Sequence, residues 1–391
     1  IRICLVGSEM CIRDSYYVSN PMALTTMGLV DLGKDMSIQP GVAVAWENTK
    51  DLMKYTFELR QGAEYHNGRT IDAESVVWNI QRMQDPKIGH ALHRSALKNI
   101  KEAKADGNYV HFMLEKPSAV LPANLVYYPA NLIAPDSVDQ VDEHPIGCGA
   151  FMFKSWKRYA KTELVRFPNY FEMGEDGKPL PYLDAVEAYP KREDKVRITA
   201  LRSGEVDMIE NMSYFDAPDF EANEADKYNI FKSPQVGTSH FNLQAKSGPM
   251  AMSGGEDAKL LRQAVAHAID KQGVHEAVFN GLGEPLDTFY ASGSPWHLDG
   301  VKPGPEYDPE KTRFILRKLN LENFPIAVVS RQAYQYMRNS AEIVHAMLLE
   351  AGFNATNEVF DNPVLQAKYE KDDYGLDSTA SSFRFDPDGH L

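Results

Sequence analysis

Cysteine is scarce in this chain: Cys4 and Cys11 lie near the start, and Cys148 lies far from both. Residues 1–15 resemble the translation of a sequencing adapter, so we leave them out of the fold prediction as a non-native segment. Cys148 then has no intramolecular partner, which excludes a disulfide framework. A lone cysteine of this kind is usually a small buried apolar side chain.

Positive charge and long apolar runs are also scarce. The chain carries 41 Lys and Arg against 55 Asp and Glu, a formal net charge of −14. Nucleic acids and anionic lipids are recognised by clustered basic residues, so this balance argues against both partners. No apolar stretch approaches the roughly 20 residues that cross a bilayer. The 391 residues are enough for two or three globular domains.

Motifs of common catalytic and metal sites are missing as well. The sequence contains no HExxH, no paired CxxC and no GxSxG. His90 and His93 have the spacing of two metal ligands but no third partner, and the glycines at 281–283 lack the lysine of a phosphate loop. We therefore expect no enzyme, no cofactor and no metal.

The strongest local pattern runs over residues 54–86, KYTFELRQGAEYHNGRTIDAESVVWNIQRMQDP. Its first residues alternate between apolar and polar, which predicts a half-buried strand over 55–59. Asp72 is a suitable N-cap for a helix whose apolar stripe ends before Asp85 and Pro86. The stretch therefore predicts a strand, a turn and a helix.

This stretch resembles the signature of the family 5 extracellular solute-binding proteins, the receptors of ABC importers for peptides, oligopeptides and nickel. The matching residues are Trp46, Thr56, Phe57, Leu59, Arg60, Gly62, His66, Asn67, Gly68, Ala73, Glu74, Val76 and Trp78. Tyr65 and Ser75 depart mildly from the pattern. Further family-like segments lie at 145–156, 169–184 and 261–274, and the resemblance covers residues 17–391.

Strands and helices alternate along the rest of the chain. We predict strands at 106–114, 238–244, 325–329 and 359–361, helices at 196–201, 257–280 and 341–351, and a polar helix or turn at 95–105. Asp308 and Pro309 open a further helix. This alternation predicts an α/β chain with mixed sheets.

The resemblance implies a two-lobed periplasmic binding protein of type II, in the large peptide-binding subclass, with the ligand in an interlobe cleft. The expected parts are the non-native segment 1–15, a first-lobe subdomain 16–146 with the TFELRQG motif, a first-lobe core subdomain 147–240, and a C-terminally truncated second lobe 241–391. Clefts between lobes are common binding sites for small ligands.

The resemblance also supplies candidate ligand-binding residues, each of which could equally serve packing or capping. They are Tyr17, Asn20, Asn211, Tyr214, His240, Asn242, Phe383, Arg384 and Asp386. Where peptide receptors of the family carry an Asp for the ligand's ammonium, this chain has Phe383, followed by Arg384. A guanidinium is suited to carboxylates, so Arg384 either recognises an anionic group of the ligand, or points to solvent, or pairs with Asp386 or Asp388.

The expected function is that of a substrate-binding protein of an ABC importer, which captures peptides or a related small solute by lobe closure. The alternative is a non-peptide anionic solute, such as an opine, a sugar conjugate or a metal complex; an enzyme is a weak third possibility. The expected partners are the membrane permease and the ATPase subunits. We expect a monomer that is periplasmic or lipid-anchored, with its signal peptide missing from this sequence.

Overall fold

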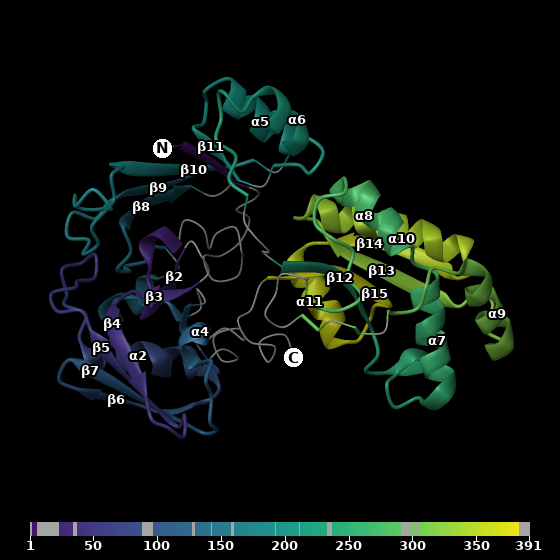
Figure 1. Cartoon of the computed structure of the whole chain (residues 1–391), viewed down its shortest axis with the longest axis horizontal. Coiled ribbons are helices and arrows are strands. Elements are labelled where there is room, and N and C mark those ends of the chain that lie inside the picture. Colours follow the sequence, from purple (N-terminus) through teal and green to yellow (C-terminus); the bar gives the residue numbers. More distant parts are fainter. Residues whose placement is uncertain are drawn as a thin grey trace. The chain divides into compact units, whose positions relative to one another are not determined.

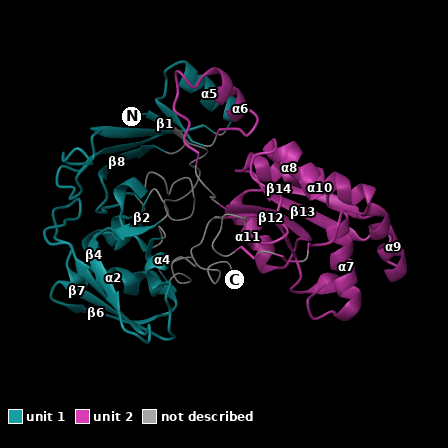
Figure 2. Cartoon of the chain, in the orientation of Figure 1, with its two compact units in different colours: residues 1–211, 384–391 teal, residues 212–383 magenta. Residues whose placement is uncertain are grey.

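The computed structural model describes residues 2–5, 23–33, 37–87, 97–126, 130–141, 143–157, 160–191, 193–210, 212–232, 237–290, 297–298, 300–301 and 303–382. The chain divides into two compact units (Figure 2). The first unit comprises residues 1–211 with 384–391, and the second comprises residues 212–383. The lobe limits expected from the sequence, at 147 and 241, remain predictions.

The first unit contains an antiparallel sheet in the order β4-β5-β7-β6. Its strands are β4 (Ala43–Asn48), β5 (Lys54–Leu59), β6 (Ile100–Asp106) and β7 (Tyr109–Leu114). The predicted strand at 55–59 is confirmed. The strand predicted at 106–114 begins later than expected, at Tyr109, because Asp106 ends β6 and the chain turns at Gly107. The polar helix or turn predicted at 95–105 is wrong, because β6 turns at Gly107 and pairs with β7. Its core-facing side chains include two small alanines, which give only a weak alternating signal.

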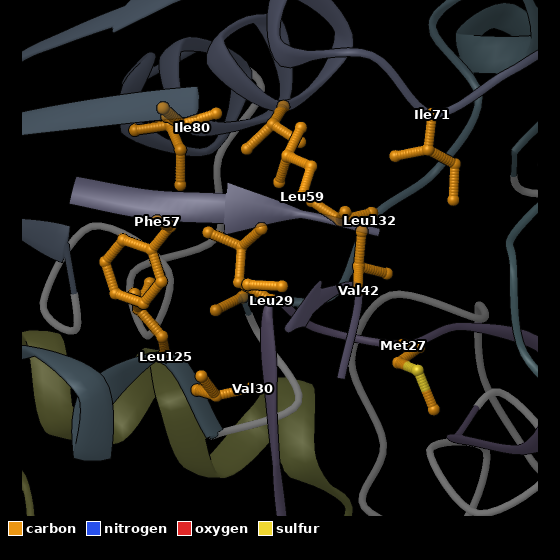
Figure 3. Packing of buried hydrophobic residues seen from close by; sticks show 14 of the residues in the cluster. Met27, Leu29, Val30, Val42, Phe57, Leu59, Ile71, Ile80, Leu125 and Leu132 are labelled. Atoms are coloured by element: carbon orange, nitrogen blue, oxygen red, sulfur yellow. The ribbon is translucent and has the colours of Figure 1, made fainter. Parts of the chain in front are cut away.

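Helix α2 (Ala73–Gln84) packs on β6 and β7, as the sequence predicts a helix there. The Asp72 carboxylate accepts a hydrogen bond from the Ser75 N–H at 2.8 Å and so caps the first turn. Ile80 belongs to the same buried apolar core as Phe57 and Leu59 of β5 (Figure 3). Each fully buried side chain of this size contributes about 1.5–3 kcal/mol.

A second sheet of the first unit has the order β11-β1-β10-β9-β8. Its strands are β1 (Arg2–Leu5), β8 (Phe151–Lys157), β9 (Lys161–Arg166), β10 (Ala185–Pro190) and β11 (Met208–Ile209), and helix α5 (Asp194–Arg202) lies between β10 and β11 in sequence. Strand β1 pairs in parallel with β10 and β11. Residues from the adapter-like segment thus occupy a strand position. Smaller elements are β2 (Val30–Leu32), β3 (Ile38–Pro40) and α4 (Leu121–Val126).

The second unit is built on a mixed sheet in the order β12-β15-β13-β14 (Figure 1). Its strands are β12 (Gly237–Leu243), β13 (Pro325–Arg331), β14 (Asn354–Phe360) and β15 (Leu376–Ser382). Strand β13 is parallel to β14 and β15, and β12 is antiparallel to β15. Helix α10 (Gln335–Glu350) connects β13 to β14, and α11 (Asn362–Glu370) connects β14 to β15. These crossovers run in opposite directions along the sheet, so right-handed connections place α10 and α11 on opposite faces.

The remaining helices of the second unit are α6 (Ala217–Asn223), α7 (Gly255–His267), α8 (Lys271–Phe279) and α9 (Pro309–Leu319). We predicted a single helix over 257–280, but the structure has two. Helix α7 ends at His267, and α8 begins at Lys271. The Asp270 side chain caps α8 by accepting from the Gly273 N–H at 3.0 Å. Asp308 caps α9, as predicted. None of the helices in the described ranges is long and apolar enough to cross a membrane.

Candidate functional site

The two faces of the sheet in the second unit differ sharply in chemistry. Successive side chains of a strand point to opposite faces, and the strand register fixes which residues share a face. One face carries Phe241, Leu243, Val328 and Leu376, which pack with α10 in an apolar core. We call the other side the polar face and define it by five residues. These are His240, Asn242, Arg331, Asp377 and Thr379.

Arg331 and Asp377 form the centre of the polar face. A guanidinium nitrogen of Arg331 lies 3.3 Å from Asp377 Oδ1 and donates to Thr379 Oγ1 at 2.9 Å. The other terminal nitrogen donates to the Tyr369 hydroxyl of α11 at 2.6 Å. Asp377 is 2% exposed, so burial raises the pKa of its carboxyl, and the charge of Arg331 offsets part of that increase. The Arg331 side chain remains 19% exposed.

His240 and Asn242 continue the polar face onto β12. His240 stands opposite Thr379, and Asn242 stands opposite Asp377. Burial lowers the pKa of His240, so the imidazole is neutral near pH 7. Its Nδ1 lies 3.1 Å from the Thr238 carbonyl, which can only accept, so Nδ1 carries the proton and Nε2 is an acceptor. Asn242 is exposed.

An aromatic side chain borders this part of the face. The Phe289 ring lies 5.3 Å from the His240 ring, between centroids. The Thr238 hydroxyl of β12 donates a hydrogen bond to the Phe289 carbonyl at 3.0 Å, which holds the backbone at Phe289 next to β12. The polar face therefore combines a guanidinium, an amide and a neutral imidazole beside an apolar ring.

This set of groups is suited to binding. Arg331 and Asn242 supply donors, and the guanidinium has the geometry that pairs with carboxylates. Among the described residues, no group of three His, Cys, Asp or Glu side chains could hold a metal ion. Arg331 is the last residue of β13, and ligands of open α/β sheets usually bind beyond the carboxyl ends of parallel strands.

Of the nine residues predicted to bind ligand, three fall in the described ranges. His240 and Asn242 lie together on the polar face. Tyr214 packs against the Phe279 ring of α8, 5.2 Å between centroids, and its role in binding stays a prediction. The other six lie outside the described residues. They are Tyr17, Asn20, Asn211, Phe383, Arg384 and Asp386.

The sequence reasoning missed Arg331, Asp377 and Phe289. The available signal was a polar residue at the end of the predicted strand 325–329, followed much later by alternating polar residues over 377–381. Their meeting depends on the pairing of β13 with β15, which no local pattern reveals.

The histidine of the family-like motif has a different setting, in the first unit. His66 Nε2 donates to the Gly149 carbonyl at 2.9 Å, and the Phe167 ring lies 4.9 Å away. Burial lowers the pKa of His66 to about 4, so it is neutral near pH 7. It also lines a cavity of about 190 Å³ whose other walls include Ile146 and Phe153. The nearby Cys148 is a buried free thiol, and burial raises its pKa to about 12.

Comparison with known families decides the identity of the chain. The model of the bacterial extracellular solute-binding proteins, family 5, matches residues 37–390. The chain belongs to this family. Family 5 proteins are the solute-binding components of ABC importers, which confirms the resemblance seen in the sequence.

Individual relatives of this family 5 protein are distant. It is 24% identical over 371 residues to a glutathione-binding protein, GsiB, of Escherichia coli O6:K15:H31, which covers 92% of this chain and 69% of the relative. Its fold matches the Helicobacter pylori protein DppA in complex with the peptide STSA, with a TM-score of 0.86 at 19% identity, over 100% of this chain and 79% of DppA. It also matches AgaA of A. tumefaciens R10 in complex with agropinic acid, with a TM-score of 0.83 at 24% identity, over 97% and 76% of the two chains. The α/β fold of two-lobed binding proteins is thereby confirmed.

Proposed function

We propose that this family 5 protein captures a small solute that carries a carboxylate, and that the polar face supplies the groups that anchor it. The observation that carries the proposal is the guanidinium of Arg331, which lies beside Asp377 at the carboxyl end of β13 on a side chain that is 19% exposed. Asn242 and neutral His240 extend this donor and acceptor surface. One charge-assisted hydrogen bond to such a solute contributes about 1.5–3 kcal/mol.

Two kinds of solute share this chemistry. A peptide and a non-peptide acid both present a carboxylate, and the similar proteins named above are described with glutathione, a peptide and agropinic acid. The hypothesis that Arg384 recognises an anionic group would add a second guanidinium and favour the non-peptide acid. A ligand with two separated acidic groups would suit both arginines.

The wider mechanism follows from family membership. The solute is captured by closure of the lobes and delivered to a membrane permease, while partner subunits hydrolyse ATP. Closed and loaded states stabilise each other, so the permease can distinguish a loaded monomer from an empty one. The family is extracellular, and we propose the periplasm, free or lipid-anchored, as the site of action.

The decisive experiment starts from the full-length protein. Native mass spectrometry of the purified protein identifies a co-purified ligand: a ladder of peptide masses indicates peptide import, and one discrete acid indicates a specialised receptor. Titration calorimetry with that ligand then compares Asn242→Ala with Asn357→Ala, an exposed asparagine of β14 on the opposite face of the sheet.

We expect Asn242→Ala to weaken binding by about tenfold, which corresponds to about 1.4 kcal/mol. Asn357→Ala should bind like the wild type. Equal affinities of the wild type and both variants would contradict the proposed site.

A further inference from the structure

We propose that Phe289 is a specificity-determining residue of the solute site, and that it selects acids carrying a flat ring or a bulky apolar group. This inference rests on the proposed function, because it assigns Phe289 to one wall of the polar face. Recognition would then have two parts: donors of the polar face hold the carboxylate, and the Phe289 ring packs against the apolar group.

The first argument is that the ring is held in place from several sides. The Thr238 hydroxyl fastens the Phe289 carbonyl, and the ring contacts His240 at an interplanar angle of 59°. Tyr290 packs edge-on against Phe289, 5.4 Å between centroids. The Tyr290 carbonyl in turn accepts from the Thr288 hydroxyl at 2.8 Å. A ring fixed in this way loses little further freedom when a ligand packs against it.

The second argument is that Phe289 is anchored without being buried. It is 36% exposed and does not belong to the apolar core of the second unit, whereas Phe241 on the adjacent β12 packs on that core. An apolar ring that is fixed at the edge of a polar surface adds little to folding stability. It does offer the apolar wall that small-ligand sites combine with a few placed polar groups.

The third argument concerns the neighbour of the ring. His240 carries no charge near pH 7 and directs its Nδ1–H to the Thr238 carbonyl. The two adjoining rings therefore form an uncharged aromatic surface next to Asn242 and Arg331. A solute can pair its carboxylate with the guanidinium of Arg331 and pack its ring on this surface at the same time.

The experiment uses two matched probe pairs with the full-length protein. N-benzoylglycine and N-acetylglycine share a carboxylate and an amide but differ in the ring, and the dipeptides Ala-Phe and Ala-Ala differ in the same way. Calorimetry or ligand-observed NMR measures their affinities for the wild type, Phe289→Ala and Phe289→Tyr. Phe314→Ala, which removes an exposed ring of α9, is the control.

We expect the wild type to prefer the ring-bearing member of each pair by about three- to tenfold, the usual strength of one aromatic contact. Phe289→Ala should lose this preference and leave affinity for the ringless probes unchanged. Phe289→Tyr and Phe314→Ala should both keep the preference.

Three results would overturn the inference: a wild type without the preference, a preference that survives in Phe289→Ala, or an equal loss for both members of a pair. Asn242→Ala separates this failure from that of the proposed site. If Asn242→Ala weakens all probes while Phe289→Ala leaves the preference intact, only the role of Phe289 is rejected. If Asn242→Ala weakens none, the polar face itself is rejected.

Discussion

The two faces of the β12-β15-β13-β14 sheet are made by alternate residues of the same strands, yet one face is apolar and the other is polar. On the α10 face, Val328 and Leu376 are buried among other apolar side chains. On the polar face, Asp377 is buried to a similar degree, whereas the side chain of its partner Arg331 is 19% exposed. Because a shift of register by one residue would exchange the two faces, the sequence must fix the pairing of these strands strictly.

The apolar face and the polar face should contribute differently to the stability of the fold. Apolar burial contributes about 25 cal/mol per Å² removed from water. A buried ion pair contributes little or nothing net, because desolvation of both charges offsets their attraction. The polar face is therefore poorly explained by stability alone, and solute recognition is the role that we propose for it.

The largest stability effect should come from the apolar face. Leu348 of α10 is 0% exposed, whereas its neighbour Leu349 is 47% exposed. Leu348→Ala should lower the free energy of unfolding by about 3 kcal/mol, since it leaves a cavity that the core cannot fill. Urea denaturation followed by circular dichroism measures the loss, and solute affinity should stay unchanged.

Leu349→Ala is the matched control and should change the free energy of unfolding by no more than about 0.5 kcal/mol. Comparable losses for the two leucines would show that α10 does not bury the face described here.

A smaller stability effect, but a large binding effect, is expected on the polar face. Asp377→Leu should lower the free energy of unfolding by about 2 kcal/mol, because the mostly buried side chain of Arg331 then has no carboxylate partner in Asp377. The double variant Asp377→Leu with Arg331→Met should return to within about 1 kcal/mol of the wild type. Its affinity for acidic solutes should fall at least about tenfold.

A double-mutant cycle on unfolding free energies measures this coupling. Glu256→Ala, which breaks an exposed pair with Lys259, serves as the control and should cost less than about 0.5 kcal/mol. A double variant that binds acids normally would mean that the Arg331 pair is purely structural.

These contrasts also show what the sequence could reveal. Strand β5 and helix α2 were predictable because their signals are local. Apolar and polar residues alternate along β5, Asp72 caps α2, and an apolar stripe follows the cap. His240 and Asn242 were predicted from the family resemblance, which places them on a strand that crosses between lobes; the structure places both on β12, and their role in binding stays a prediction. Arg331 and Asp377 were not found, because 46 residues separate them and only the tertiary pairing of their strands brings them together. The helix break at Asp270 was missed because the apolar period continues on both sides of the cap.

The smallest effect concerns two histidines that are both neutral near pH 7 but have different surroundings. Burial lowers the pKa of His66 from 6.5 to about 4, and the pKa of His240 is also lowered. For such groups the unfolded state takes up the proton first, so their contribution is complete above about pH 6.5 and is lost as the pH falls toward the folded-state pKa. The Thr238 carbonyl, Asp377 and Asn242 favour the charged form of His240 against the opposing charge of Arg331, whereas the Gly149 carbonyl is the group that favours the charged form of His66.

We therefore expect His66→Gln to remove about 1–2 kcal/mol of the stability that the wild type loses between pH 7 and pH 5, because glutamine can still donate to the Gly149 carbonyl but does not titrate. His240→Gln should remove less of this pH-dependent loss of stability, because the polar neighbours of His240 stabilise a protonated imidazole. Urea denaturation of the three proteins at pH 7, 6 and 5 makes the comparison. If both substitutions flatten the pH dependence to the same degree, the polar face does not solvate His240 better than the apolar surroundings solvate His66, and the contrast between the two environments would have to be abandoned.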